Sequence, residues 1–233
     1  MRKPHFPKLL RLPAMGALVA ATATAMAVAP AAAGPGFGPR VGGPRADSGN
    51  WAGYAAHGAS GKFTKITGSW TEPVATCSGS KLAAPWIGLD GYSTQTVEQT
   101  GVAVSCSGSQ ASYAGWYEMY PANPVYFSNP VSAGDKFTAS VTNTSGHTYK
   151  LVLEDVTKGW THTENKTLAS AEDASAEAIL EGPGGYPGFP NGVSFTNIKV
   201  DGKTFSSYSP TKLTSGGFVP GPLNGGSFTI THS

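Results

Sequence analysis

The stretch Gln95-Thr-Val-Glu-Gln-Thr-Gly-Val-Ala-Val104, followed after a short interval by Ser112-Tyr-Ala-Gly-Trp-Tyr-Glu-Met-Tyr120, decides the fold class of this chain. In both runs apolar and polar residues alternate, and Val, Thr and aromatic residues recur, which is typical of half-buried β-strands. The interval between them contains Gly108 and several serines, residues that mark turns. The stretch therefore predicts strands separated by a turn.

The same pattern recurs from Asn50 to the end of the chain. Turn signals follow one another at intervals of roughly 8–15 residues, which is typical of β-sandwiches and β-barrels. Its other runs are Phe63–Thr71, Pro85–Leu89, Lys136–Val141, Thr148–Asp155, Ala176–Glu181 and Gly192–Val200. Leu168–Leu180 has a helix-like composition, but Pro183 and a glycine cluster end it, so we expect its second half to be a strand. We predict an all-β chain whose residues 49–233 form a single antiparallel β-sandwich of two packed sheets, similar to the concanavalin and jelly-roll sandwiches.

The composition excludes several classes of protein. The chain has 233 residues, 39% of them hydrophobic, which is enough for one folded domain. The 31 glycines and 18 prolines are too many for a long-helix protein, and they show no collagen period. Charged residues make up only 13%, against about 25% in an average domain.

The positive net charge of +2 belongs to the beginning of the chain. Six basic residues and no acidic ones fall within the first 45 positions; they are Arg2, Lys3, Lys8, Arg11, Arg40 and Arg45. From Ala46 onward, 10 basic residues face 14 acidic ones, a net charge of −4. The body therefore lacks the basic runs that bind phosphate backbones, and we do not expect it to bind nucleic acid.

The beginning of the chain also has the pattern of a secretory signal peptide. A basic start is followed by the uncharged run Leu12–Pro30 and by small residues up to Ala33. We expect residues 1–33 to be the signal peptide, with cleavage after Ala33 or alternatively after Ala29; a retained membrane anchor is the weaker interpretation. Residues 34–48, rich in Gly and Pro, are expected to form a flexible lead-in. The protein is thus predicted to be secreted.

The two cysteines, Cys77 and Cys106, agree with secretion, because an oxidising compartment would pair them. A disulfide closing a loop of about 30 residues would contribute roughly 3–4 kcal/mol in the chain-entropy model. Two cysteines are too few for a zinc or iron–sulfur cage. The histidines His57, His147 and His162 are scattered without the spacing of metal ligands, so we predict no metal site.

Motifs of several enzyme classes are absent. The sequence has no Gly-x-Ser-x-Gly elbow, no phosphate-binding or dinucleotide-binding glycine loop and no His-Glu-x-x-His. A Ser-His-Asp triad stays open, because triads assemble in space rather than in sequence. We predict no nucleotide or other cofactor.

Five segments combine aromatic and polar residues within predicted strands. They are Asn50–Tyr54, Trp86–Gly91, Glu98–Gly101, Trp116–Pro121 and Ala176–Glu181. Strand alternation places Trp116, Glu118 and Tyr120 on one face. A sheet face that bears Trp, Tyr, Glu and Gln together is poor core material and suits a cleft.

The five segments contain, in this order, Trp-Ala-Gly-Tyr, Trp-Ile-Gly-Leu-Asp-Gly, Gln-Thr-Gly, Trp-Tyr-Glu-Met-Tyr-Pro and Ala-Glu-Ala-Ile-Leu-Glu. Together they resemble the motifs of the glutamic peptidases, the eqolisin family, over about residues 50–205. The resemblance implies a secreted, acid-acting endopeptidase on a sandwich of two antiparallel sheets, with polypeptide substrates and no cofactor. We also expect the mature protein to be a monomer and to have no association with the membrane once the signal peptide is removed.

The family's catalytic Gln–Glu dyad corresponds to Gln99 and Glu177 of this sequence. The resemblance further implies that six other residues line the cleft or support the dyad; they are Trp51, Gly53, Trp86, Asp90, Glu118 and Tyr120.

This pair of residues suits peptide hydrolysis by water, which needs a base for the water's proton and a donor for the oxyanion. A glutamate, with a reference pKa near ~4.3, is still partly ionised at mildly acidic pH. A glutamine amide cannot titrate, so it donates at any pH. The reaction requires neither a metal nor a covalent intermediate.

The sequence departs from the family pattern at several positions. Ala178 stands where a Trp is usual beside the catalytic Glu, so a subsite or packing contact is expected to be missing. Glu98 stands where an apolar residue is common, which the fold would tolerate if that face, opposite Gln99, is solvated. Glu181 shares a strand face with Glu177, about 13 Å away, and is the alternative base. The short lead-in also lacks the longer propeptide of well-known members.

Two other functions compete with this interpretation. A carbohydrate-active sandwich could use Glu118 and Glu177 as paired carboxylates, which requires a separation of roughly 5–10 Å and gives Gln99 no catalytic part. A non-catalytic adhesion or structural domain would cleave nothing, with its tryptophans as core residues and Asp90 as a turn residue.

Overall fold

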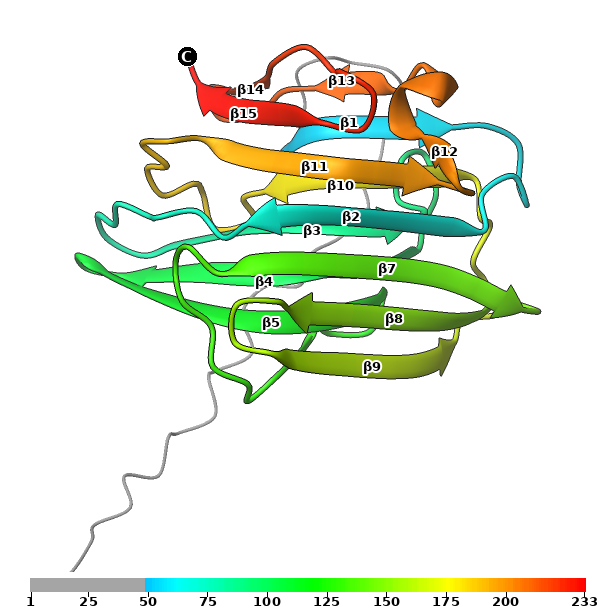
Figure 1. The fold of residues 1–233 in the computed structure, drawn as a ribbon, viewed down its shortest axis with the longest axis horizontal. Coiled ribbons are helices and arrows are strands. Elements are labelled where there is room, and N and C mark those ends of the chain that lie inside the picture. Colours follow the sequence, from blue (N-terminus) through cyan, green and yellow to red (C-terminus); the bar gives the residue numbers. More distant parts are fainter. Residues whose placement is uncertain (1–48) are drawn as a thin grey trace, which may run out of the picture. The chain divides into compact units, whose positions relative to one another are not determined.

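The computed structural model describes residues 49–233, which fold into two antiparallel β-sheets (Figure 1). The predicted all-β sandwich is therefore confirmed. The signal peptide and lead-in predicted within residues 1–48 lie outside the described residues. The part of the chain that is described includes no helix long and apolar enough to span a membrane.

One sheet has seven strands and carries all five motif segments. In the order of hydrogen-bonded neighbours they are β13 (Thr211–Leu213), β1 (Trp51–His57), β10 (Ser175–Glu181), β3 (Lys81–Leu89), β4 (Val97–Ser107), β5 (Gln110–Tyr120) and β6 (Val125–Tyr126). Strands far apart in the sequence are thus neighbours, since β10 lies between β1 and β3.

The second sheet lies in front of the first in Figure 1. Its strand order is β14 (Phe218–Pro220), β15 (Phe228–His232), β11 (Val193–Val200), β2 (Lys65–Thr71), β7 (Lys136–Ser145), β8 (Thr148–Asp155) and β9 (Trp160–Thr167), and β12 (Lys203–Thr204) pairs with β11. Within residues 49–233 the only helical element is a short 3-10 helix, η1 (Phe205–Tyr208).

The hydrophobic core lies between the two sheets. In β2, buried residues alternate with more exposed ones, so that Ile66 and Trp70 point inward. The Trp70 ring stacks on Phe137 of β7 with centroids 5.7 Å apart, and Phe195 of β11 lies 6.0 Å away. Alternating burial of this kind fixes the register, because a slip of one residue would turn the aromatic side chains outward.

Gly53 allows β1 to lie close to β10. Its φ is 150°, and a Cβ there would lie 2.2 Å from the carbonyl oxygen of Ala178. No other residue fits this position without moving the backbone. The glycine of the Trp-Ala-Gly-Tyr motif is therefore needed for strand pairing beside the site.

The predicted disulfide is confirmed. Cys77 and Cys106 are joined, with their Cα atoms 5.5 Å apart. The bond links the segment before β3 to the end of β4, and Cys106 also pairs with Lys81 in the β3–β4 ladder. The cross-link thus fastens two of the strands that carry the motifs.

Candidate active site

The seven-stranded sheet has a second face, turned away from the core between the sheets. Period-two alternation assigns a separate cluster of buried apolar residues to this face. Its members are Trp51, Ala55, Ala84, Trp86, Tyr92, Val97, Ala103, Trp116, Ile179 and Leu213. Buried carboxyl and amide groups lie among them, so the face combines apolar walls with a few polar groups, as ligand sites do.

The strand register brings four residues of this face into one row across the sheet. Glu177 of β10 pairs with Gly88 of β3, Gly88 pairs with Gln99 of β4, and Gln99 pairs with Glu118 of β5. Neighbouring strands lie about 4.8 Å apart, so the backbones of Glu177 and Gln99 are roughly 10 Å apart with both side chains on one face. All three polar side chains are buried. Residues 78 positions apart in sequence, Gln99 and Glu177, thus face one another across a glycine.

Gly88 keeps the middle of this row without a side chain. A Cβ at Gly88 would lie 3.0 Å from the Gln99 Cβ, the Glu98 carbonyl oxygen and the Trp86 ring. That distance is shorter than an ordinary van der Waals contact between these atoms. A side chain at this glycine of Trp-Ile-Gly-Leu-Asp-Gly would therefore displace the Trp86 ring or the Gln99 side chain.

Glu118 orients the amide of Gln99. The Gln99 Nε2 donates a hydrogen bond to Glu118 Oε2 at 2.7 Å, and both groups are buried. The short distance is typical of a charge-assisted bond. Burial and the neighbouring Glu118 carboxyl raise the pKa of Tyr126, on β6, to about 12. Glu118 is thus a support for Gln99, as the motif resemblance implies.

Glu177 is a fully buried carboxyl with an altered proton affinity. Burial raises its pKa well above the ordinary value, and the Asp90 and Glu98 carboxyls add to the rise. The nearby Ser175 hydroxyl and Tyr92 N–H oppose the rise, although neither is at full hydrogen-bond distance and geometry from the Glu177 carboxyl oxygens. The Tyr92 N–H also donates to the Ser175 Oγ at 3.2 Å, which links the two supporting groups.

Asp90 holds the segment that leads into β10. Its carboxylate accepts three backbone N–H bonds, from Glu172 at 2.7 Å, Asp173 at 2.8 Å and Ala174 at 2.7 Å. Asp90 also adopts a positive φ of 63° in the turn after β3. It is therefore both a turn residue and an anchor for the start of the strand that carries Glu177.

Glu181, the alternative base, is engaged elsewhere on the same face. Its carboxylate accepts hydrogen bonds from Trp86 Nε1 at 3.0 Å and Asn50 Nδ2 at 2.6 Å. The Trp86 ring packs edge-on against Trp51 with centroids 4.9 Å apart. Glu181 pairs with Ala84, four residues along β3 from Gly88, and so lies outside the row of Gln99. Glu181 thus fixes the position of Trp86, which packs against Trp51.

Trp116 and Tyr120 lie on the same face of β5 as Glu118. Trp116 is fully buried beside Gly101, and the half-buried Tyr120 pairs with Val97. Trp116, Glu118 and Tyr120 thus share one face, as strand alternation predicted.

The structure changes the interpretation of two departures from the family pattern, those at Ala178 and Glu98. Ala178 points into the core between the sheets, where Tyr54 and Ile87 are its register partners, so it affects packing and no subsite. The condition under which the fold would tolerate Glu98, a solvated face, is not met, because Glu98 is fully buried.

Three groups next to the dyad were not found from the sequence. Gly88 lies inside a recognised motif, but only the strand register shows that it separates Gln99 from Glu177. Ser175 directly precedes the Ala-Glu-Ala-Ile segment, and the Tyr92 main chain comes from a loop. Neither has a sequence signal of its own.

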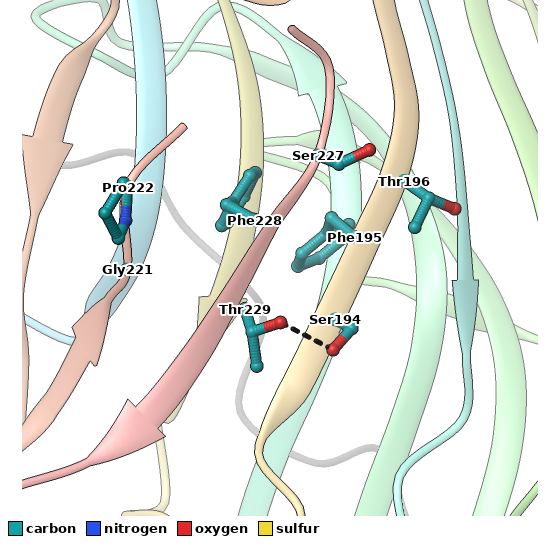
Figure 2. Close-up of a pocket in the computed structure, with 8 residues that line it drawn as sticks. All are labelled: Ser194, Phe195, Thr196, Gly221, Pro222, Ser227, Phe228 and Thr229. Atoms are coloured by element: carbon teal, nitrogen blue, oxygen red, sulfur yellow. Dashed lines mark hydrogen bonds between the residues drawn. The ribbon is translucent and has the colours of Figure 1, made fainter. Parts of the chain in front are cut away.

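A separate open pocket of about 440 Å³ lies on the other sheet (Figure 2). Its lining consists of Ser194, Phe195, Thr196, Gly221, Pro222, Ser227, Phe228 and Thr229. The Ser194 and Thr229 hydroxyls are 2.8 Å apart within it. The lining has no titratable side chain, so the pocket offers no acid–base chemistry. Among residues 49–233, no group of three or more His, Cys, Asp and Glu residues is arranged to hold a metal ion.

Comparison with known sequences shows which protein family this chain matches. A model of the Peptidase A4 family matches residues 49–215. Scytalidopepsin B of Scytalidium lignicola is 32% identical over 137 residues, which make up 57% of this chain and 51% of that protein. The match thus spans about half the length of this curated relative.

Solved structures agree in fold. The crystal structure of scytalido-glutamic peptidase with a transition state analog inhibitor has a TM-score of 0.70 at 23% identity and covers 79% of this chain and 98% of that one. Aspergilloglutamic peptidase from Aspergillus niger has a TM-score of 0.54 at 28% identity over 65% of this chain and 99% of that one. Because the family model covers most of the chain, this protein belongs to the peptidase A4 family, the eqolisin glutamic peptidases that its motifs resemble.

Proposed function

We propose that this protein is a secreted, acid-acting endopeptidase in which Gln99 and Glu177 hydrolyse peptide bonds with an activated water. The observation that supports this most is the row of Glu177, Gly88, Gln99 and Glu118. It places a titratable carboxyl and an amide on one buried face, with only the side-chain-free Gly88 between them in the strand register. Membership of a glutamic peptidase family supports the same chemistry.

The reaction follows from the roles that these groups can take. A water bound between the dyad gives a proton to the Glu177 carboxylate and attacks the peptide carbonyl carbon. The carbonyl oxygen gains negative charge, and a second N–H of the Gln99 amide donates to it, while Glu118 holds the amide in place. Glu177 then passes its proton to the leaving nitrogen, and the C–N bond breaks. Apart from the substrate and the water, only Glu177 forms and breaks a covalent bond, to the proton that it takes up and passes on.

Apolar side chains surround the polar row. Trp51, Trp86 and Trp116 are buried beside it, and Glu181 accepts a hydrogen bond from Trp86. The related peptidase SCP-B is described in complex with the tripeptide Ala-Ile-His, at a TM-score of 0.66 and 23% identity to this chain. We therefore take polypeptides as the substrate class.

Export of the chain is part of the proposal. The basic, apolar and small-residue order of residues 1–33 supports a signal peptide. The disulfide of Cys77 and Cys106 supports folding in an oxidising compartment. We expect the released protein to act as a monomer.

The carbohydrate-active alternative fits the geometry less well. Glu118 and Glu177 are three strands apart, so their backbones are separated by about 14 Å, and Gly88 and Gln99 lie between them. A glycosidase pair needs carboxyls roughly 5–10 Å apart and has no use for the amide that Glu118 orients.

Incubation of the protein with denatured protein substrates and, in parallel, with a panel of polysaccharides from pH 2 to 7 tests the proposal. We expect peptide bonds to be cleaved on the acid side of neutrality and glycans to stay intact. Glycan cleavage, or no peptide cleavage at any pH by folded protein, would overturn the peptidase assignment.

A small side chain at Gly88 is expected to impair catalysis. Gly88→Ala pushes a methyl group into the gap beside Gln99, so kcat/KM should fall roughly 10–10²-fold through misplacement of the reacting groups. Gly188→Ala is the matched control, because a Cβ there meets only ordinary contacts at 3.4 and 3.5 Å. Steady-state kinetics of both variants checks this; equal activities would show that the gap is not where substrate reacts.

The Ser175 hydroxyl is expected to set the acid limb of the pH profile. The base must be ionised, so kcat/KM rises as the pH passes upward through the pKa of Glu177, which burial raises and Ser175 lowers. Ser175→Ala removes the lowering contact, and the acid limb should move to higher pH. Ser175→Thr keeps a hydroxyl and should restore the limb. An acid limb that is identical in wild type and Ser175→Ala would contradict this role.

A further inference from the structure

Directly behind the row, on the core side of the same sheet, three carboxyl groups meet. They belong to Asp90 after β3, Glu98 of β4 and Asp173 before β10, and we call them the buried acid cluster. Asp90 and Glu98 have no exposed surface, and Asp173 is 4% exposed. The proposed reaction does not use Glu98, whose side chain points away from the substrate face.

Two members of the buried acid cluster accept several hydrogen bonds. Asp90 accepts the three backbone N–H bonds described above. Asp173 accepts a hydrogen bond from the Tyr149 hydroxyl at 2.8 Å and another from Asn143 Nδ2 at 2.7 Å. These donors replace the hydrogen bonds to water that both carboxyl groups lose on burial.

Glu98 has less support, because the nearby Thr96 side chain lowers its pKa while interaction with the Asp90 carboxyl raises it. Neither of its carboxyl oxygens has a hydrogen-bond partner of normal distance and geometry. Burial, followed by the nearby carboxyls of Asp90 and Asp173, raises its pKa to about 10. Three carboxylates cannot all be ionised at close range in a dry core, so the folded protein keeps a proton on Glu98.

The surroundings contain little positive charge to change this balance. Tyr149 of β8 faces the cluster with a hydroxyl whose pKa is raised, and Glu177 lies across the sheet. Within residues 49–233, the only cationic side chain at ion-pair distance from the cluster is His147, with its Nε2 3.9 Å from Asp173 and its side chain 40% exposed. A half-exposed histidine screens Asp173 weakly and does not contact Glu98.

We infer that Glu98 makes the folded state of this protein depend on acid: the chain takes up a proton at Glu98 when it folds, and the fold weakens as the surroundings are neutralised. The inference concerns folding and holds whether or not Gln99 and Glu177 form the dyad. Glu98 would thus set an upper pH limit on the stability of the fold, and this limit is separate from the pH at which the Glu177 carboxyl ionises.

The direction follows from proton linkage. The folded pKa of Glu98 is raised above that of the unfolded chain, so its stabilisation is complete below about pH 4.5 and is lost as the pH rises toward about 10. Between about pH 4.5 and about pH 10, each rise of one pH unit shifts the folding equilibrium about tenfold toward unfolding. The shift amounts to about 300-fold between pH 4.5 and pH 7. Burial also raises the pKa values of Glu72 and Glu177, which act in the same direction.

Urea unfolding of wild type and Glu98→Gln between pH 4 and pH 7.5 measures how much of the pH dependence of folding stability is due to Glu98. Glutamine has nearly the same shape and is neutral in both the folded and unfolded states. The two proteins should be similarly stable at pH 4, and the variant should be the more stable at pH 7, by about two orders of magnitude in the unfolding equilibrium constant. Glu172→Gln, at an exposed glutamate next to the cluster, is the matched control and should follow wild type.

Parallel loss of stability in wild type and Glu98→Gln as the pH rises would overturn the inference. If Glu98→Gln does not fold, Glu98→Met offers a second neutral side chain of similar size and should show the same reduced pH dependence. If neither folds, NMR titration of the Glu98 carboxyl carbon in wild type decides. A carboxyl that stays protonated through pH 7 supports the inference, and one that ionises below pH 6 overturns it.

Discussion

Glu177→Gln is expected to lower kcat/KM for peptide hydrolysis by roughly 10³–10⁴-fold, near the upper end of what one acid–base group contributes. The substitution keeps the size of the side chain but removes the site that accepts the water's proton and later returns it to the leaving nitrogen. The buried, neutral glutamine should fit the fold, because the native carboxyl is itself easily protonated there. Initial rates on a peptide substrate, with circular dichroism to confirm folding, measure the effect.

Glu181→Gln is the matched control for this substitution. The Glu181 carboxylate already accepts hydrogen bonds from Trp86 and Asn50, so replacing Glu181 with glutamine should change KM more than kcat. Activity that survives Glu177→Gln but disappears in Glu181→Gln would move the base to Glu181. It would also require substrate to bind four residues farther along β10.

Gln99→Ala is expected to lower kcat by roughly 10²–10³-fold with a small change in KM, the usual effect of removing one oxyanion donor. The donor acts mainly once charge develops on the carbonyl oxygen, so substrate binding should be affected little. Gln110→Ala, at an exposed glutamine at the start of β5, controls for the loss of an amide. Measuring kcat and KM separately distinguishes the two effects.

A rise in KM alone for Gln99→Ala would show that the amide binds the ground state and has no special part in the transition state. The hydrogen bond from Gln99 to Glu118 also predicts that Glu118→Leu impairs kcat through Gln99, since the amide loses the partner that orients it.

The strands were predictable where Val, Thr and aromatic residues recur between turn signals, even in β4 and β10, which are buried on both faces over most of their length. The runs containing Gln99 and Glu118 became β4 and β5, and the second half of Leu168–Leu180 became β10. Strand β9, Trp160–Thr167, was not among the predicted runs. It lies at the sheet edge with half-buried and exposed residues alternating, so its apolar pattern is faint.

The motifs identified Gln99 and Glu177, but a linear sequence does not contain their relation in space. Only the register of β10, β3 and β4 shows that Gly88 lies between them. The burial of Glu98 could not be predicted for a similar reason. Whether a strand face is wet depends on the opposite sheet, and here Tyr149 and the segment around Asp173 cover it.

The central claim is that Gln99 and Glu177 act together on one water and one carbonyl group. A double-mutant cycle of Gln99→Ala, Glu177→Gln and the combined variant, measured as kcat/KM on one peptide substrate at one acidic pH, tests it most directly. If the two side chains work as a unit, the double variant should lose little more than Glu177→Gln alone, because a donor gains nothing once the attacking water is not activated. Losses that multiply fully would show independent roles and contradict the dyad.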